Sequence, residues 1–166
     1  MAQAAPAALD FGGTMTARIP NPAIAAGPDV LPALLSVAEA VKKTGLPETT
    51  LNLVYLRASQ INGSSWNVNK HSSDLKAAGE SDERIHTVAS WRDTPFFTPE
   101  ERAALALAEA ATLLAGPDPV SDEVWAEAAK YYNDQELAGI LLATGFNNLW
   151  HRLMPTTRQP AQPVAG

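Results

Sequence analysis

Three polar residues in the middle of the chain have a spacing that could support chemistry. Ser64, Asn67 and His71 are three and four residues apart, so on an α-helix their side chains share one face. Histidine can take or give a proton near neutral pH, and serine and asparagine both donate and accept hydrogen bonds. The pattern indicates a site for acid–base chemistry or for binding a small organic molecule, with Ser64 and His71 as candidate catalytic residues and Asn67 as a candidate substrate contact.

The segment that contains this face carries a specific motif. Residues 56–63 read LRASQING and lead directly into residues 64–71, SSWNVNKH. This run resembles the signature of the alkylhydroperoxidase D-like, or carboxymuconolactone decarboxylase, superfamily, in which L-R-x-S-Q-I-N-G is followed by C-x-x-C-x-x-x-H. The two family cysteines fall on Ser64 and Asn67, whereas the family histidine is present as His71. The family glutamate, twelve residues before the first cysteine, falls on Asn52, which the resemblance places at the same site as a substrate contact.

Loss of both cysteines decides which chemistry remains. The resemblance implies a thiolate that attacks a peroxide and a second cysteine that resolves the sulfenic acid to a disulfide. The chain contains no cysteine, and a serine hydroxyl is a far weaker nucleophile that cannot form a sulfenic acid. We therefore expect no thiol peroxidase activity by this route, but a retained pocket lined by neutral hydrogen-bonding groups.

A second match lies near the C-terminus. Residues 143–153, ATGFNNLWHRL, resemble the family's closing helix, commonly N-x-W-N-R-L, with His151 where asparagine is usual. We add His151 to the candidate catalytic residues, and Asn147, Trp150 and Trp66 to the candidate substrate contacts. The resemblance covers about residues 17–158 and implies the family's helical fold.

Each candidate also has a purely structural interpretation. His71 could be a buried, hydrogen-bonded histidine, and His151 a solvated histidine near a helix end. Ser64 could act only as a helix N-cap, and both tryptophans could be packing residues. A metal site needs several converging histidine and carboxylate ligands, and the sequence offers only His71 and a distant His151. We expect neither a metal nor another cofactor.

The elements that must position these residues are expected to be helices. Apolar residues recur at helical spacing between short breaks, and no alternating strand pattern occurs. Residues 98–101, TPEE, are the strongest start signal, because they combine an N-cap, a proline in the first turn and a glutamate three residues after the cap. We predict an all-α fold of about seven helices, at residues 30–44, 47–61, 64–79, 81 onward, 98–115, 121 onward and 133–153.

Length and composition predict one domain with two loose ends. A chain of 166 residues with 46% hydrophobic content is long enough for a single core. Residues 1–16 and 155–166 lack a periodic pattern and are predicted to be flexible, on either side of a helical domain at residues 17–154.

Charge and hydropathy argue against two classes of partner. The net charge is −6 and the 12 Lys and Arg residues are scattered, so there is no basic patch to bind nucleic acid. No apolar run approaches the roughly 20 residues that span a membrane, and the first residues lack the positive flank of a signal peptide. A cytoplasmic protein without a membrane partner is expected.

Three interpretations of function remain open. The first is a non-redox acid–base enzyme, of the decarboxylase, isomerase, lyase or cyclase type, that acts on a small-molecule substrate in a repurposed pocket. The second is a non-catalytic metabolite-binding or scaffold protein, and the third is a deliberately altered version of a dithiol parent. By resemblance, the chain is also expected to self-associate as a trimer or a higher oligomer, and the apolar last helix is compatible with such a contact.

Overall fold

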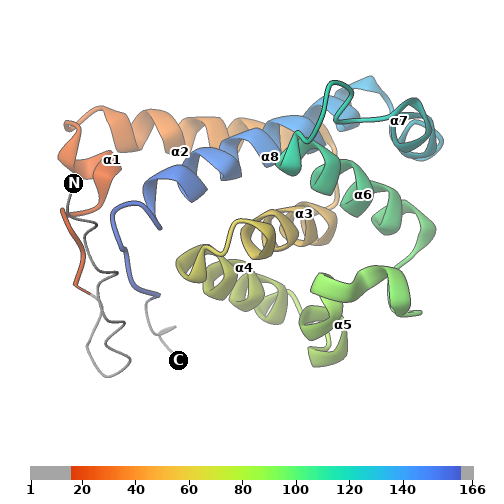
Figure 1. The fold of residues 1–166 in the computed structure, drawn as a ribbon, viewed down its shortest axis with the longest axis horizontal. Coiled ribbons are helices and arrows are strands. Elements are labelled where there is room, and N and C mark those ends of the chain that lie inside the picture. The colour runs from red at the N-terminus through yellow and green to blue at the C-terminus, as the bar shows by residue number, and fades with distance from the viewer. Residues whose placement is uncertain (1–15, 162–166) are drawn as a thin grey trace, which may run out of the picture.

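The computed structural model describes residues 16–161, which form helices joined by short loops (Figure 1). The described residues contain eight α-helices, two 3-10 helices and no strand, so the predicted all-α class is confirmed. In chain order the elements are α1 (Pro22–Ala25), α2 (Val30–Val41), η1 (Lys42–Thr44), α3 (Glu48–Ile61), α4 (Ser65–Ala77), α5 (Asp82–Thr87), η2 (Val88–Asp93), α6 (Pro99–Leu113), α7 (Asp122–Ala128) and α8 (Asp134–Leu153).

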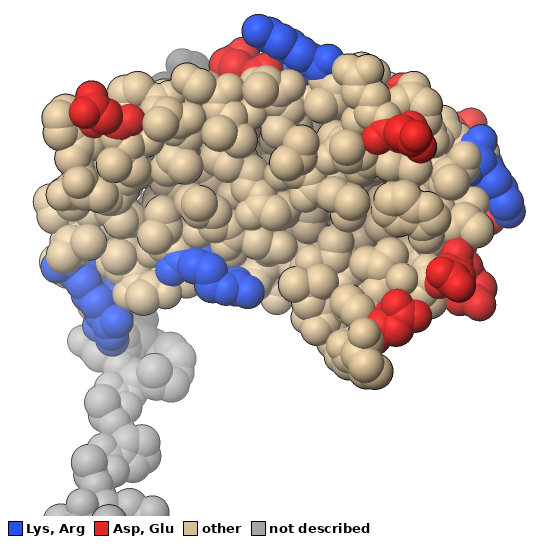
Figure 2. All heavy atoms as spheres, turned by 90° about the horizontal axis from the view of Figure 1, so that it is seen from above, with Lys and Arg blue, Asp and Glu red and all other residues tan. Residues whose placement is uncertain are grey.

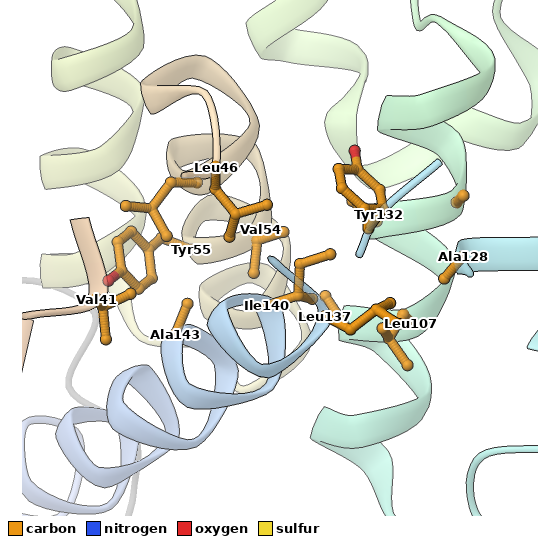
Figure 3. Packing of buried hydrophobic residues seen from close by; sticks show 14 residues of the cluster. Val41, Leu46, Val54, Tyr55, Leu107, Ala128, Tyr132, Leu137, Ile140 and Ala143 are labelled. Atoms are coloured by element: carbon orange, nitrogen blue, oxygen red, sulfur yellow. The ribbon is translucent and has the colours of Figure 1, made fainter. Parts of the chain in front are cut away.

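Helix α3 is the central element, because it packs against α4, α6 and α8. On one side, a buried cluster joins α3 to α6 and α8 through Val54, Leu107 and Ile140 (Figure 3). On the other side, a second cluster joins α3 to α4 and to the segment before α6, with Leu53 and Leu75 fully buried. Each such side chain contributes about 1.5–3 kcal/mol when it leaves water, so α3 is held firmly between its neighbours.

The helix starts agree with the capping signals in the sequence. The Thr98 hydroxyl accepts a hydrogen bond from the Glu101 backbone N–H, and the Glu101 carboxylate accepts one from the Thr98 backbone N–H, which completes a capping box. Asn133 and Glu136 make the same reciprocal pair at the start of α8. The predicted starts of α6 and α8 are confirmed. Helix α6 ends at Leu113, two residues before the predicted end, because Leu114 is left-handed with φ of 44°.

Helix α2 is unusual because it is apolar but mostly exposed. Of its twelve residues only Val41 is buried. The helix runs beside α8 (Figure 1) and continues into η1, which ends at Gly45 with φ of 96°. This left-handed conformation favours glycine and terminates the helix as predicted.

The described parts of the two ends hydrogen-bond to each other. The Arg18 backbone N–H donates to the Thr157 carbonyl at 2.9 Å, and the Gln159 side chain donates to the Ile19 carbonyl at 2.9 Å. Residues 1–15 and 162–166, which hold most of the predicted flexible ends, lie outside the described residues, and their flexibility stays a prediction. Within residues 16–161, none of the helices is long and apolar enough to cross a membrane.

Candidate functional site

A cavity of about 640 Å³ opens between α2, α3, α4 and α8. Its volume lies within the range of about 300–1,000 Å³ that is usual for small-molecule sites. Apolar and aromatic side chains form most of the wall, and polar groups come mainly from α3 and α4. Six of the eight candidates from the sequence line it, namely Asn52, Trp66, Asn67, His71, Asn147 and Trp150.

His71 lines the cavity from α4 and makes few polar contacts. Its ring stacks on Tyr55 from α3, with ring centroids 4.9 Å apart and an interplanar angle of 24°. Its Nδ1 atom is buried without a hydrogen-bond partner and lies 3.6 Å from Oδ2 of Asp74, which is longer than a hydrogen bond. Nε2 of the same ring also has no partner among the described residues. The imidazole therefore has capacity for a ligand.

Asp74 lies one helical turn after His71 on α4 and faces the same cavity. The His71 imidazole beside Asp74 lowers the pKa of this carboxyl, and the Lys70 ammonium lowers it further. Partial burial raises the pKa, but by less than these two groups lower it. Both carboxylate oxygens accept from the Lys70 ammonium at 2.8 Å. A carboxylate kept ionised beside a histidine can orient the ring and stabilise its protonated form.

Two asparagine amides bring neutral hydrogen-bonding capacity to the cavity wall. Asn52 on α3 is 7% exposed, and no described residue hydrogen-bonds to its side chain. The Asn67 amide nitrogen donates to the Ser64 hydroxyl at 2.9 Å, which leaves its carbonyl oxygen without a described partner. Neither asparagine is among the described residues whose buried polar atoms lack a partner, and both line the cavity, so these groups can contact a bound molecule.

Ser64 lies beneath the cavity and does not line it. The residue is 1% exposed and occupies the N-cap position of α4, as the structural interpretation predicted, but its side chain makes no capping hydrogen bond. Its hydroxyl instead accepts from Asn67. In this position Ser64 supports the orientation of the Asn67 amide.

His151 also lies outside the cavity lining, in the contact between α8 and α3. It is 3% exposed, and burial lowers its pKa to about 4, with smaller contributions from the charges of His71 and Arg152. Its Nδ1 atom is 3.1 Å from the Asn62 amide nitrogen. These surroundings hold a neutral imidazole, and the expectation of a solvated helix-end histidine is wrong because α3 covers the ring.

Ser59 and His151 resemble a nucleophile and its base, but the proton geometry argues against that role. The Ser59 oxygen lies 3.0 Å from His151 Nε2, yet the hydroxyl donates its hydrogen to the Tyr55 carbonyl at 2.7 Å. The His151 Nε2–H must then donate to the serine oxygen, so this nitrogen has no lone pair to accept the serine proton. Ser59 is also completely buried, and the pair joins α3 to α8.

Sequence reasoning missed Tyr55 and Asp74 as cavity residues. Each lies three residues after a recognised candidate, Tyr55 after Asn52 and Asp74 after His71, and helical spacing could have suggested both. Burial raises the pKa of Tyr55 to about 12, so its phenol keeps its proton and can donate. Phe146 and the α2 residues on the wall carry no local signal, because they reach the cavity only through helix packing.

The described residues hold no group of three or more His, Cys, Asp or Glu side chains that could bind a metal ion. The polar groups on the cavity wall are amides, a phenol, an imidazole and paired charges. This set is suited to hydrogen bonding and proton transfer.

Sequence comparison agrees with the motif. Residues 28–110 match the model of the carboxymuconolactone decarboxylase family. The uncharacterized protein YdfG of Bacillus subtilis (strain 168) is 30% identical over 126 residues, which are 76% of this chain and 85% of YdfG.

Structural comparison agrees with the fold. The crystal structure of ATU0492 from Agrobacterium tumefaciens, a protein of unknown function suggested to be the antioxidant defence protein AhpD, is similar with a TM-score of 0.82 and 29% identity, over 90% of this chain and 100% of ATU0492. The debrominase Bmp8, solved in complex with 2,3,4-tribromopyrrole, has a TM-score of 0.75 at 17% identity, over 84% of this chain and 74% of that protein. The second likeness is one of fold alone. The predicted alkylhydroperoxidase D-like fold is confirmed.

Proposed function

Because the chain belongs to the carboxymuconolactone decarboxylase family but contains no cysteine, we propose that it is a non-redox acid–base enzyme that acts on a small organic molecule in this cavity. The observation that carries the proposal is His71, an imidazole whose two nitrogens have no hydrogen-bond partner within residues 16–161, beside an ionised carboxylate in the cavity wall. Without a cysteine the chain has no thiol of its own for dithiol chemistry.

The proposed chemistry is a proton transfer to or from the substrate. A contraction of the 3.6 Å separation between His71 Nδ1 and Asp74 Oδ2 would form an N–H···O hydrogen bond and leave Nε2 as the basic nitrogen. Nε2 would take a proton from the substrate, and Asp74 would stabilise the resulting imidazolium. The imidazolium can exchange this proton with solvent and then return a proton to another substrate atom, as isomerisation and cyclisation require, or to a leaving group, as elimination requires.

Asn52 and Asn67 would hold the polar group of the substrate during this transfer. Their amides can donate to an oxygen on which negative charge develops, and Tyr55 can add a third donor. Trp66 and Trp150 would exclude water from the reacting atoms.

The test is a screen for conversion. Metabolites that raise the melting temperature of the full chain would be incubated with it, and the products identified by mass spectrometry. We expect at least one ligand to be converted, and His71→Gln to reduce the rate about 10²- to 10⁴-fold, the usual contribution of a general base. His86→Gln is the matched control, because His86 is exposed on α5 away from the cavity.

The variant Asp74→Asn tests whether Asp74 orients the His71 ring or only contributes to substrate binding. We expect a fall in kcat of about tenfold with little change in KM, because the ring loses its orienting carboxylate. Ligands that bind and are all recovered unchanged would contradict the enzyme and favour a metabolite-binding protein, for which the Asn52 amide and the Asn67 carbonyl oxygen are equally suited.

A further inference from the structure

We propose that the cavity selects neutral, flat ring molecules that carry an amide group, and discriminates against carboxylates. The inference rests on the proposed function in one respect, that this cavity is the substrate site. It concerns binding, and it can be tested without any turnover.

Both lysines that line the cavity already contact carboxylates. Lys42 lies 2.8 Å from Glu39, and Lys70 contacts both oxygens of Asp74. Glu48 also lines the cavity, and together with Glu39 and Asp74 it raises the pKa of Lys42. Three carboxylates therefore face two lysines, and neither lysine is left to pair with an anion.

The interior groups are uncharged and offer both donors and acceptors. Asn52 presents an amide and Asn67 a carbonyl oxygen that have no hydrogen-bond partner among the described residues, and Tyr55 presents a phenol. An amide on the ligand can donate to a carbonyl oxygen and accept from an N–H or O–H group. A carboxylate can only accept, so it would leave the Asn67 oxygen unsatisfied.

Aromatic side chains give the cavity flat walls. Phe146 and Trp150 on α8 meet edge to face, with ring centroids 6.2 Å apart and an interplanar angle of 90°, and Trp66 lines the cavity from α4. Rings of this kind bind flat ligand rings by stacked or edge-to-face contacts.

Desolvation makes the discrimination against anions substantial. An ionised carboxylate that leaves water without a positive partner pays a large cost, whereas a neutral amide loses little if its hydrogen bonds are replaced. This preference disfavours decarboxylation among the proposed reaction types, because that reaction requires a carboxylate substrate.

The experiment compares two ligands of equal shape and different charge. Binding of 2-naphthamide and 2-naphthoate to the full chain would be measured by calorimetry at about pH 7.5, where the acid is ionised. We expect a Kd for the amide at least about tenfold lower than for the carboxylate. Binding of neither compound, or naphthoate binding as tightly as naphthamide, would overturn the proposal.

Variants identify the cause of the difference. The double change Glu39→Gln and Glu48→Gln releases Lys42, and we expect it to strengthen naphthoate binding about threefold relative to naphthamide binding. Glu127→Gln is the matched control, because Glu127 forms the same i,i+3 pair with Lys130 but does not line the cavity. If Glu127→Gln and the double variant changed naphthoate binding equally, the carboxylates beside Lys42 would not be the cause of the discrimination.

The binding experiment and the conversion screen test the selectivity and the catalytic proposal separately. If naphthamide binds preferentially but the conversion screen finds no product, the selectivity stands and the catalytic proposal fails. If a carboxylate proves to be the converted substrate, the catalytic proposal stands and the selectivity is wrong.

Discussion

At the residue scale, two histidines on neighbouring helices have different surroundings and therefore different properties. His71 faces the cavity, stacks on Tyr55 and, in the described part of the chain, has no hydrogen-bond partner on its ring nitrogens. His151 is enclosed between α8 and α3 and donates to Ser59. Sequence motifs made both histidines candidates for catalysis, and the packing of α8 on α3 separates them.

The buried His151 should make stability depend on pH. Burial lowers its folded-state pKa to about 4 from 6.5, so between these values the unfolded chain binds the proton more readily. Stability should therefore fall as pH decreases through this window, by up to about 1.4 kcal/mol per pH unit from this group, and no further below pH 4.

Urea denaturation of the wild type and of His151→Asn at several pH values would measure this contribution. Asparagine cannot titrate, so the variant should lose less stability than the wild type between about pH 6.5 and pH 4. An identical pH dependence in both proteins would show that His151 already binds a proton in the folded state.

Local spacing could predict only part of the site. The motif and the helical face identified Asn52, Asn67 and His71, because these residues lie within one segment of sequence. Phe146 comes from α8, and its place beside residues of α4 depends on how the helices cross. Ser64 belongs to the same helical face but is covered by Asn67, a detail of side-chain packing that residue spacing does not contain.

At the element scale, the sequence predicts the starts of long, capped helices better than it predicts the existence of short helices. Residues 98 and 133 begin helices through reciprocal side-chain and backbone hydrogen bonds that are encoded within four residues. Helix α1 has four residues and η2 has a non-helical residue, Ser90. Both were missed, because they are too short to show a period and depend on tertiary contacts.

Two glycines of α8 should respond oppositely to alanine. At Gly139 an added Cβ would lie 2.3 Å from the Thr44 hydroxyl oxygen and 2.9 Å from the Thr44 Cβ, so Gly139→Ala should destabilise the fold by about 1–3 kcal/mol. At Gly145 nothing lies within 4 Å, and alanine should stabilise the helix by about 0.5–1 kcal/mol.

Denaturant titration of both single variants tests the close approach of α8 to η1. The two substitutions make the same chemical change in one helix, so their difference isolates the contact with Thr44. Stabilisation by Gly139→Ala would mean that α8 and η1 lie further apart than the structure shows.

At the scale of the whole molecule, the surface has a broad uncharged face. Figure 2 shows this face with acidic and basic side chains mostly at its margins. Large apolar side chains are also exposed on two neighbouring helices, with Leu35 53% and Val37 42% exposed on α2 and Leu142 55% exposed on α8. Exposed apolar patches of this kind commonly mark contacts between proteins.

We propose that the chain self-associates through α2 and α8. Sedimentation should show an oligomer, and the double change Val37→Glu and Leu142→Glu should shift it to a monomer, because charges would be buried in the contact. Phe96→Glu is the control, since Phe96 is 41% exposed outside these helices. A monomeric wild type, or an unchanged oligomer in the double variant, would contradict this surface.

The central claim is that a family fold without cysteines uses His71 to move a proton. The most direct measurement is deuterium incorporation from D₂O into a metabolite that the chain converts, followed by mass spectrometry. We predict incorporation with the wild type and with His86→Gln, and a loss of about 10²-fold or more with His71→Gln. Equal incorporation with the wild type and with His71→Gln would contradict the account.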